Sequence, residues 1–146
     1  MTYSRMGTIS KQLVLKNSIS EVRVLSSTVE EFCEKNNFSD EVTHDIRLAL
    51  EEIFSNIVFY GFQDQDEHQI AISFSLKNNT LILEIKDDGI PFNPLEFKTP
   101  DLEIPIEERK TGGMGIHIAG ELVDEIEYFR KQNNNILVMK KNNIIT

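Results

Sequence analysis

Glu52 and Asn56 are two residues whose types and spacing could do chemistry together. They stand four residues apart in a segment with helical apolar periodicity, and side chains four apart project from one face of an α-helix. The pair could therefore converge on a single ligand through hydrogen bonds and charge. The alternative is a solvated polar pair on a helix surface, and the short motif taken alone favours that alternative.

Asp87 is a carboxylate at a position that strand alternation assigns to the core. Period-two alternation places it on the same face as Leu81, Leu83 and Ile85. An inward carboxylate needs hydrogen-bond donors, so its presence there indicates a partner such as the amine of a bound ligand. The alternative is a strand that ends earlier, which would leave Asp87 in an Asp-Asp-Gly turn.

Glycines occur at two further points where a ligand could approach the backbone. At Gly89, the missing Cβ would permit either a positive φ or close contact with a flat ligand. The segment 111–115, Thr-Gly-Gly-Met-Gly, opens a predicted helix directly after Arg109 and Lys110. Free N–H groups and the dipole at a helix start favour phosphate oxygens, although a glycine-rich helix entry can also serve packing alone.

Other catalytic motifs are not supported by the sequence. Segment 112–115 lacks the Gly-Lys-Ser/Thr ending of a P-loop, which excludes a P-loop enzyme. His44 begins a His-Asp-Ile-Arg segment similar to the phosphoacceptor box of sensor histidine kinases, but it lies only twelve residues before Asn56. It is therefore interpreted as an ordinary helix residue. His68 and His117 have no spacing typical of a catalytic triad or a zinc site.

The composition is that of one globular domain spanning residues 1–146. The chain is 40% hydrophobic and 27% charged. A net charge of −9 argues against direct nucleic-acid binding, which needs clustered Lys and Arg. Cys33 is the single cysteine, so no internal disulfide is expected and we interpret it as buried or inert. No apolar run is long enough for a signal peptide or membrane span, which predicts a cytoplasmic protein without membrane association.

Hydrophobic periodicity predicts three elements in the first half of the chain. A short strand is expected at 11–15, with Leu13 and Leu15 on one face. Ser18 and Glu21 form a capping-box pattern before a first helix that ends near residue 36. The strongest helix begins at a Ser39 cap and ends at Gly61.

The second half of the chain is predicted to be richer in strands. Its expected elements are a hairpin over 70–85 with a turn at Asn78-Asn79, a proline-containing loop over 91–105, a short helix over 114–123, and a closing hairpin over 126–139 across Asn133-Asn134-Asn135. Two helices before one hairpin and a third helix before another predict an α+β fold. In it, helices cover one face of a mostly antiparallel sheet.

Three segments, taken in order, resemble the conserved boxes of a known superfamily. EEIFSN (51–56), DDGIPFNP (87–94) and TGGMGIHIAGELVDEIEY (111–128) resemble the N, G1 and G2 boxes of the GHKL ATPases. More narrowly, they are similar to the anti-sigma factor serine/threonine kinases. The resemblance implies a single histidine kinase-like ATPase domain with the Bergerat ATP-binding fold, a two-layer α/β sandwich with three helices over the sheet.

The resemblance also implies roles for individual residues toward ATP and Mg²⁺. Asn56 would coordinate magnesium, Asp87 would accept a hydrogen bond from the adenine amino group, and Gly89 would let the purine lie close. Glu52 would be the catalytic base, because a carboxylate can orient and deprotonate a partner's serine hydroxyl. Segment 92–112 would be the ATP lid. The remaining nucleotide-binding residues would be Arg109, Lys110, Thr111, Gly113, Met114 and Gly115.

The family implies protein partners as well as a nucleotide. A kinase of this kind phosphorylates an anti-anti-sigma partner with a STAS domain, sequesters a sigma factor, and forms a homodimer. The alternative is a non-catalytic module of the same fold that binds its partner in a nucleotide-dependent way, because fold alone does not guarantee turnover. A slow ATPase of the gyrase type is a third interpretation, but this chain has no room for its transducer domain.

Overall fold

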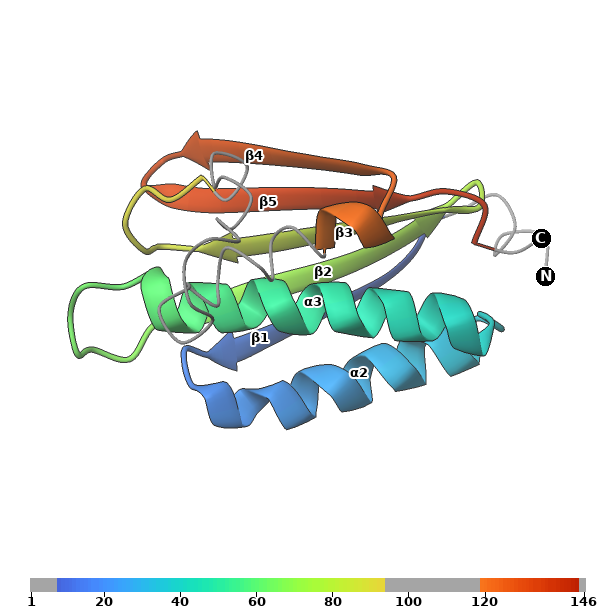
Figure 1. Ribbon diagram of the computed structural model, residues 1–146, viewed down its shortest axis with the longest axis horizontal. Helices are drawn as coiled ribbons and strands as arrows, with labels where there is room; N and C mark the ends of the chain where they lie inside the picture. Colours follow the sequence, from blue (N-terminus) through green and yellow to red (C-terminus); the bar gives the residue numbers. More distant parts are fainter. Residues whose placement is uncertain (1–7, 94–118, 145–146) are drawn as a thin grey trace, which may run out of the picture.

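Residues 8–93 and 119–144 of a computed structural model form a sheet with helices on one face (Figure 1). Within these residues the sheet has five strands in the order β1-β2-β3-β5-β4, and every neighbouring pair is antiparallel. The strands are β1 (Ile9–Lys16), β2 (Gln69–Lys77), β3 (Thr80–Asp87), β4 (Glu125–Lys131) and β5 (Asn134–Lys141). The sheet makes β3 a central strand, which matters for the site at its end.

The helices pack as a second layer against the sheet. A short 3₁₀ helix, η1 (Ile19–Glu21), leads into α2 (Val22–Lys35), and α3 (Asp40–Tyr60) lies beside α2 over the strands (Figure 1). Residues 119–122 are also helical. This arrangement confirms the predicted α+β fold. No helix in the described ranges is long and apolar enough to cross a membrane.

The ends of α3 follow from local chemistry as predicted. The Ser39 hydroxyl accepts a hydrogen bond from the Val42 backbone N–H at 3.1 Å, and two acidic residues occupy the first turn. At the other end Gly61 donates its N–H to the Ile57 carbonyl at 2.8 Å and closes the helix. These two signals fix where α3 begins and ends, and hence where its polar residues lie along the sheet.

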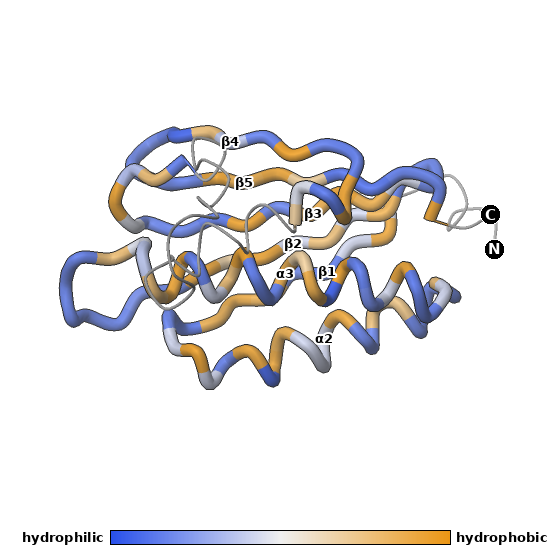
Figure 2. The backbone as a smooth tube through the Cα atoms, viewed as in Figure 1, coloured by the Kyte–Doolittle hydropathy of each residue, from blue (hydrophilic) through white to orange (hydrophobic). Residues whose placement is uncertain are grey.

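The core lies between the two helices and the inner face of the sheet. Alternate residues of β2 and β3 are buried, and Figure 2 shows apolar positions recurring along the strands and α3. Phe54 of α3 and Phe74 of β2 are fully buried. Cys33 is buried as expected, and burial raises the pKa of its thiol to about 11, so it stays protonated and unreactive at neutral pH.

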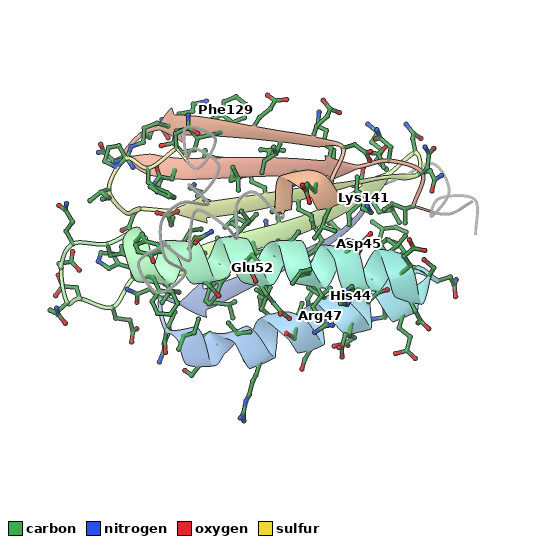
Figure 3. The ribbon with its side chains drawn as sticks, in the orientation of Figure 1. His44, Asp45, Arg47, Glu52, Phe129 and Lys141 are labelled. Carbon is green, nitrogen blue, oxygen red and sulfur yellow. The ribbon has the colours of Figure 1, made fainter. Side chains whose placement is uncertain are left out.

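Lys141 ties the helical residues 119–122 to the rest of the domain. Its Nζ donates to the Leu122 carbonyl at 2.6 Å and lies 3.6 Å from an Asp45 carboxylate oxygen on α3. A cation near the last carbonyls of a helix is favourable because it opposes the negative end of the dipole. One side chain of β5 therefore joins the helical residues 119–122 and α3 to the sheet (Figure 3).

Two predictions of local structure are wrong. Ser18 does not cap α2: its hydroxyl bonds Ser20 instead, and α2 begins at Val22 after the 3₁₀ turn. The turn between β4 and β5 is also shorter than expected. Gln132 and Asn133 carry positive φ of 52° and 67°, enough for a two-residue turn, so the asparagines that follow lie in β5. The Asn78-Asn79 turn, with φ of 50° and 64°, was predicted correctly.

Candidate functional site

Three buried polar residues meet between α3 and the sheet. In the part of the chain that the structure describes, Asn56, Asp87 and Asn135 are the polar residues classed as buried, with 4%, 4% and 6% of their surface exposed. Asp87 and Asn135 are direct neighbours in the β3–β5 ladder. All three line one small cavity, whose other walls are Ile53, Ile57, Ile85, Phe92, Tyr128 and Leu137.

The size of this cavity limits what can enter it. Its volume is about 20 Å³, and a space of roughly 10–15 Å³ holds one water-sized group. Only the edge of a planar ligand, such as an amino group, can therefore reach the buried polar atoms. The body of such a ligand has to lie outside this cavity.

Asp87 points into the core, as strand alternation predicted. Its Oδ1 accepts from the Gly89 N–H at 2.8 Å and from the Asn135 amide nitrogen at 3.1 Å. Burial raises the pKa of the carboxyl above its usual 3.8, while these two hydrogen bonds act in the opposite direction. Because both donors fall on Oδ1, the other oxygen is the one that can accept from a further donor.

Asn56 carries an unsatisfied polar atom. Its side-chain nitrogen is buried and has no hydrogen-bond partner among the described residues. A buried polar group without a partner costs about 1–3 kcal/mol, so such groups in native proteins call for an explanation. The oxygen and nitrogen of an amide exchange places by a simple flip. Asn56 can therefore offer either a donor or an oxygen ligand to a bound group.

Glu52 lies one helical turn before Asn56 and has no partner among the described residues. Its side chain is half-buried, and no described residue forms a hydrogen bond or ion pair with it (Figure 3). Glu51 differs completely: it accepts a hydrogen bond from Ser26 of α2 and lies 3.5 Å from Arg47. Only 22% of the Glu51 side chain is accessible. Glu51 fastens α2 to α3, and Glu52 remains available for chemistry.

Asn135 is a site residue that the sequence prediction missed. It was assigned to the closing turn, yet it pairs with Arg130 in the β4–β5 ladder. Its amide nitrogen donates to Asp87 and, at 2.7 Å, to the Ile90 carbonyl. Three donors meet its amide oxygen: the Tyr128 hydroxyl, the Arg130 guanidinium and the Phe92 N–H. Only a correct turn boundary would have revealed it, by placing this position opposite Asp87.

Gly89 is required by close backbone packing. Of the two predicted reasons, positive φ is not observed at any described glycine. A Cβ on Gly89 would lie 2.1 Å from the Gly61 carbonyl oxygen, where the end of α3 crosses the strand end. The Ile90 N–H donates to that same carbonyl at 2.8 Å, and Arg130 donates to the Gly89 carbonyl at 2.8 Å. The segment after β3 is thus held from both sides.

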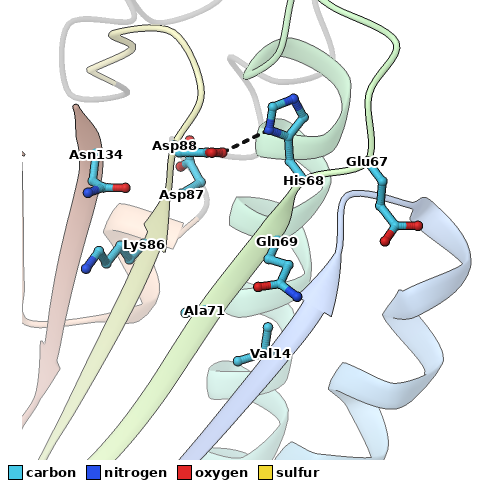
Figure 4. A pocket seen from close by; sticks show the side chains of 9 residues that line it. All are labelled: Val14, Glu67, His68, Gln69, Ala71, Lys86, Asp87, Asp88 and Asn134. Atoms are coloured by element: carbon cyan, nitrogen blue, oxygen red, sulfur yellow. Dashed lines mark hydrogen bonds and ion pairs between the residues drawn. The ribbon is translucent and has the colours of Figure 1, made fainter.

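His68 forms a second polar cluster beside Asp87. Its Nδ1 lies 3.0 Å from Asp88 (Figure 4). Its Nε2 lies 2.7 Å from Asp64, and its ring stacks on Phe62 at 4.3 Å. These carboxylates, Asp64 first, raise the pKa of the imidazole. The sequence prediction found no role for His68, because its partners lie four residues before it and twenty residues after it.

The cluster borders a wide depression on the sheet face opposite the helices. This depression is lined by Val14, Glu67, His68, Gln69, Ala71, Lys86, Asp87, Asp88 and Asn134 (Figure 4). The cross-strand row of Val14, Ala71 and Lys86 points away from the core. The buried site of Asn56 and the Asp87 side chain therefore lies on the other face of the sheet.

The remaining predicted site residues lie outside the described part of the chain. They are the lid beyond residue 93 and Arg109, Lys110, Thr111, Gly113, Met114 and Gly115. Within the described ranges, no group of three or more His, Cys, Asp or Glu side chains could hold a metal ion.

Comparison with known proteins identifies relatives of the chain. The chain is 27% identical over 123 residues to the serine-protein kinase RsbW of Bacillus thuringiensis, covering 82% of this chain and 76% of that protein. The kinase of the same name from Bacillus mycoides is 24% identical over the same coverage.

A solved structure has the same fold. The RsbU and RsbW domains of Rv1364c from Mycobacterium tuberculosis match with a TM-score of 0.68 at 15% identity, over 92% of this chain. The match covers 32% of that longer protein. The family model for the histidine kinase-like ATPase domain matches residues 15–141. The chain therefore belongs to the histidine kinase-like ATPase domain family, and its curated relatives include serine-protein kinases of the RsbW type.

Proposed function

We propose that this chain is an ATP-binding, anti-sigma factor-type serine/threonine kinase. In this role it phosphorylates an anti-anti-sigma partner of the STAS type and sequesters a sigma factor. The observation that carries the proposal is the unpaired carboxylate of Glu52, one helical turn from the buried and unsatisfied amide of Asn56. Relatives of the chain are named serine-protein kinases, which supports the same chemistry.

The buried residues are suited to hold the adenine end of ATP. The second carboxylate oxygen of Asp87 would accept from the adenine amino group, which has the size that the small cavity admits. Gly89 keeps the segment after β3 flat against the end of α3, beside that amino group. An ionised acceptor at this point would favour ATP over a purine nucleotide with a carbonyl in the same place.

Magnesium would be held mainly by ATP itself. Mg²⁺ prefers oxygen ligands and keeps several from phosphates and water, so it needs few from the protein. The amide oxygen of Asn56 would supply one. When bound, magnesium-ATP supplies the phosphoryl group and neutralises its charge. We further propose that Arg109, Lys110, Thr111, Gly113, Met114 and Gly115, within and after the lid, bind the phosphates.

Glu52 would act on the protein substrate. Its carboxylate would accept a hydrogen bond from the partner's serine hydroxyl, orient it and take up its proton. No described residue competes for that carboxylate, whereas the neighbouring Glu51 is committed to Ser26 and Arg47. A carboxylate at position 52 can act as a base, which favours transfer to a hydroxyl.

The proposed setting is a cytoplasmic switch between two protein partners. A homodimer would bind the sigma factor until phosphate transfer to the STAS partner changes the balance. The chain has a net charge of −9, which suits partners with basic surfaces. We do not propose direct contact with nucleic acid or membranes, because neither fits this charge and composition.

The test is phosphate transfer from labelled ATP to a cognate STAS-type protein. Glu52→Gln is expected to slow transfer at least ~100-fold, the low end for loss of a general base. ATP affinity should stay within about threefold. Glu51→Gln is the matched control, because it removes the adjacent charge and should leave transfer near wild type.

Other outcomes point to the alternative functions. ATP-sensitive partner binding that survives Glu52→Gln, with no transfer by the wild-type chain to any cognate serine, would identify a non-catalytic binding module. Phosphate release by the wild-type chain without a partner would instead identify a slow ATPase. Either result would refute the kinase proposal.

A further inference from the structure

The Asn135 amide joins the closing hairpin to Asp87 and has no free hydrogen-bonding position. Its nitrogen donates twice and its oxygen accepts three times, and the partners are residues of β3, of β4 and of the segment after β3. We propose that Asn135 is a positioning residue that keeps Asp87 a hydrogen-bond acceptor and thereby sets a preference for adenine over 6-oxopurines. This inference rests on the proposed ATP-binding function.

The surroundings of Asn135 determine which way its amide points. The Tyr128 hydroxyl, the Arg130 guanidinium at 3.2 Å and the Phe92 N–H at 3.3 Å all point their hydrogens at one atom. A guanidinium and a backbone N–H can only donate, so that atom must be the amide oxygen. The –NH₂ end is therefore directed at Asp87, and a flipped amide would place donor against donor.

A fixed –NH₂ group also determines how Asp87 can behave. Oδ1 receives N–H groups from Asn135 and Gly89, so it is an acceptor whose position is set on two sides. An ionised carboxylate offers Oδ2 as an acceptor too, whereas a protonated carboxyl would present O–H there. Burial raises the pKa of Asp87 and the Asn135 hydrogen bond lowers it. Asn135 thus opposes the change from acceptor to donor.

Whether Asp87 accepts or donates a hydrogen bond matters because purines differ at the atom that would meet Oδ2. Adenine carries an amino group at position 6, and hypoxanthine and guanine carry a carbonyl there. An acceptor bonds the amino group and repels the carbonyl, and a donor does the reverse. Sites that pair a buried polar group with one analogue discriminate strongly against the other, because a mismatch leaves that group unpaired.

The experiment compares Asn135→Leu with Asn134→Leu as its matched control. Asn134 precedes it on β5, and its side-chain nitrogen bonds only the Gln132 carbonyl within the turn. Calorimetry would give the affinities for ATP and for inosine triphosphate between pH 5.5 and 8.5. For Asn135→Leu we expect at least a ~10-fold loss of ATP affinity at pH 7.5 and a ~10-fold smaller preference for ATP. The control should change either quantity less than about twofold.

A second readout needs no nucleotide. The carboxyl carbon of Asp87 can be followed by NMR in the ligand-free chain, and its titration midpoint should move to higher pH in Asn135→Leu. A purely structural role would not move that midpoint. If Asn135→Leu does not fold, Tyr128→Phe serves instead, because it removes only the hydroxyl that donates to the Asn135 oxygen and changes no charge near Asp87. It should shift both readouts in the same direction by a smaller amount.

The outcomes separate this inference from the proposed function. An unmoved Asp87 midpoint in a folded Asn135→Leu, or an unchanged preference for ATP, overturns the role of Asn135. A wild-type chain that binds neither nucleotide overturns the proposed function and with it the purine preference. The Asp87 titration would then still decide whether Asn135 controls the carboxyl.

Discussion

Replacing Asp87 by asparagine separates the two demands that the site places on this position. The Asn side-chain oxygen can accept the two hydrogen bonds that Oδ1 now accepts from Gly89 and Asn135. Its –NH₂ group would then occupy the place of Oδ2 and present donors to the cavity. The fold should therefore keep its internal bonds, while the contact with an adenine amino group is lost.

The size of each effect follows from the groups involved. A hydrogen bond to a charged acceptor contributes about 1.5–3 kcal/mol, so ATP affinity should fall roughly 10- to 150-fold at neutral pH. The stability of the folded chain at neutral pH should instead rise in Asp87→Asn. The pKa of Asp87 is raised in the folded chain, so wild-type stability falls as pH rises from 3.8 through the folded value and stays lower above it. Asparagine does not ionise and has no such loss.

Two assays test this reasoning together. Calorimetry measures ATP binding, and urea unfolding at pH 4 and pH 7.5 measures stability. The stability of Asp87→Asn relative to wild type should increase from pH 4 to pH 7.5, and the variant should bind ATP poorly at pH 7.5. The control for ATP binding is Asp88→Asn, an adjacent side chain that is 58% exposed and points away from the cavity. Unchanged ATP affinity in Asp87→Asn, or a loss of stability at both pH values, would refute the assignment.

Three further changes test the surrounding framework. His68→Gln should lower stability most below pH 6.5, because the pKa of His68 is raised in the folded chain. The stabilisation by His68 is complete below its unfolded pKa and is lost as pH rises through its folded pKa. Urea titrations from pH 5.5 to 8.5 measure this. Gly89→Ala should destabilise by about 1–3 kcal/mol in thermal unfolding, since its Cβ would overlap the Gly61 carbonyl. Lys141→Met should cost about 1–2 kcal/mol, because it removes the bonds to Leu122 and Asp45; equal melting temperatures would contradict it.

The parts of the fold that the sequence predicted correctly are those controlled by local chemistry. The Ser39 cap, the Gly61 stop and the Asn78-Asn79 turn each depend on a few adjacent residues. The inward direction of Asp87 follows from the period of a strand that carries three apolar residues before it. Each of these signals is contained in a window of fewer than ten residues, so no knowledge of the tertiary fold was needed.

The parts that were missed depend on contacts between distant segments. Asn135 read as a turn residue because three asparagines in a row all favour positive φ, and the structure uses only Asn133 of them. His68 finds Asp88 only because the start of β2 lies beside the end of β3. Glu51 meets Ser26 across two helices. In each case the sequence contains the residues, but their pairing is decided by the register of the sheet and the packing of α2 on α3.

The buried polar groups are easier to explain by ligand binding than by stability. A core of this size could be completed with apolar residues, and burying Asn56 with an unsatisfied amide lowers stability by about 1–3 kcal/mol. Asp87 adds a carboxyl whose ionisation burial opposes. A ligand that bonds these groups would recover part of that free energy on binding, and it would stabilise the folded chain through mass action, by about 2.7 kcal/mol at a concentration 100 times its dissociation constant. Polar residues from α3, β3 and β5 at one cavity therefore indicate a site that is completed by what it binds.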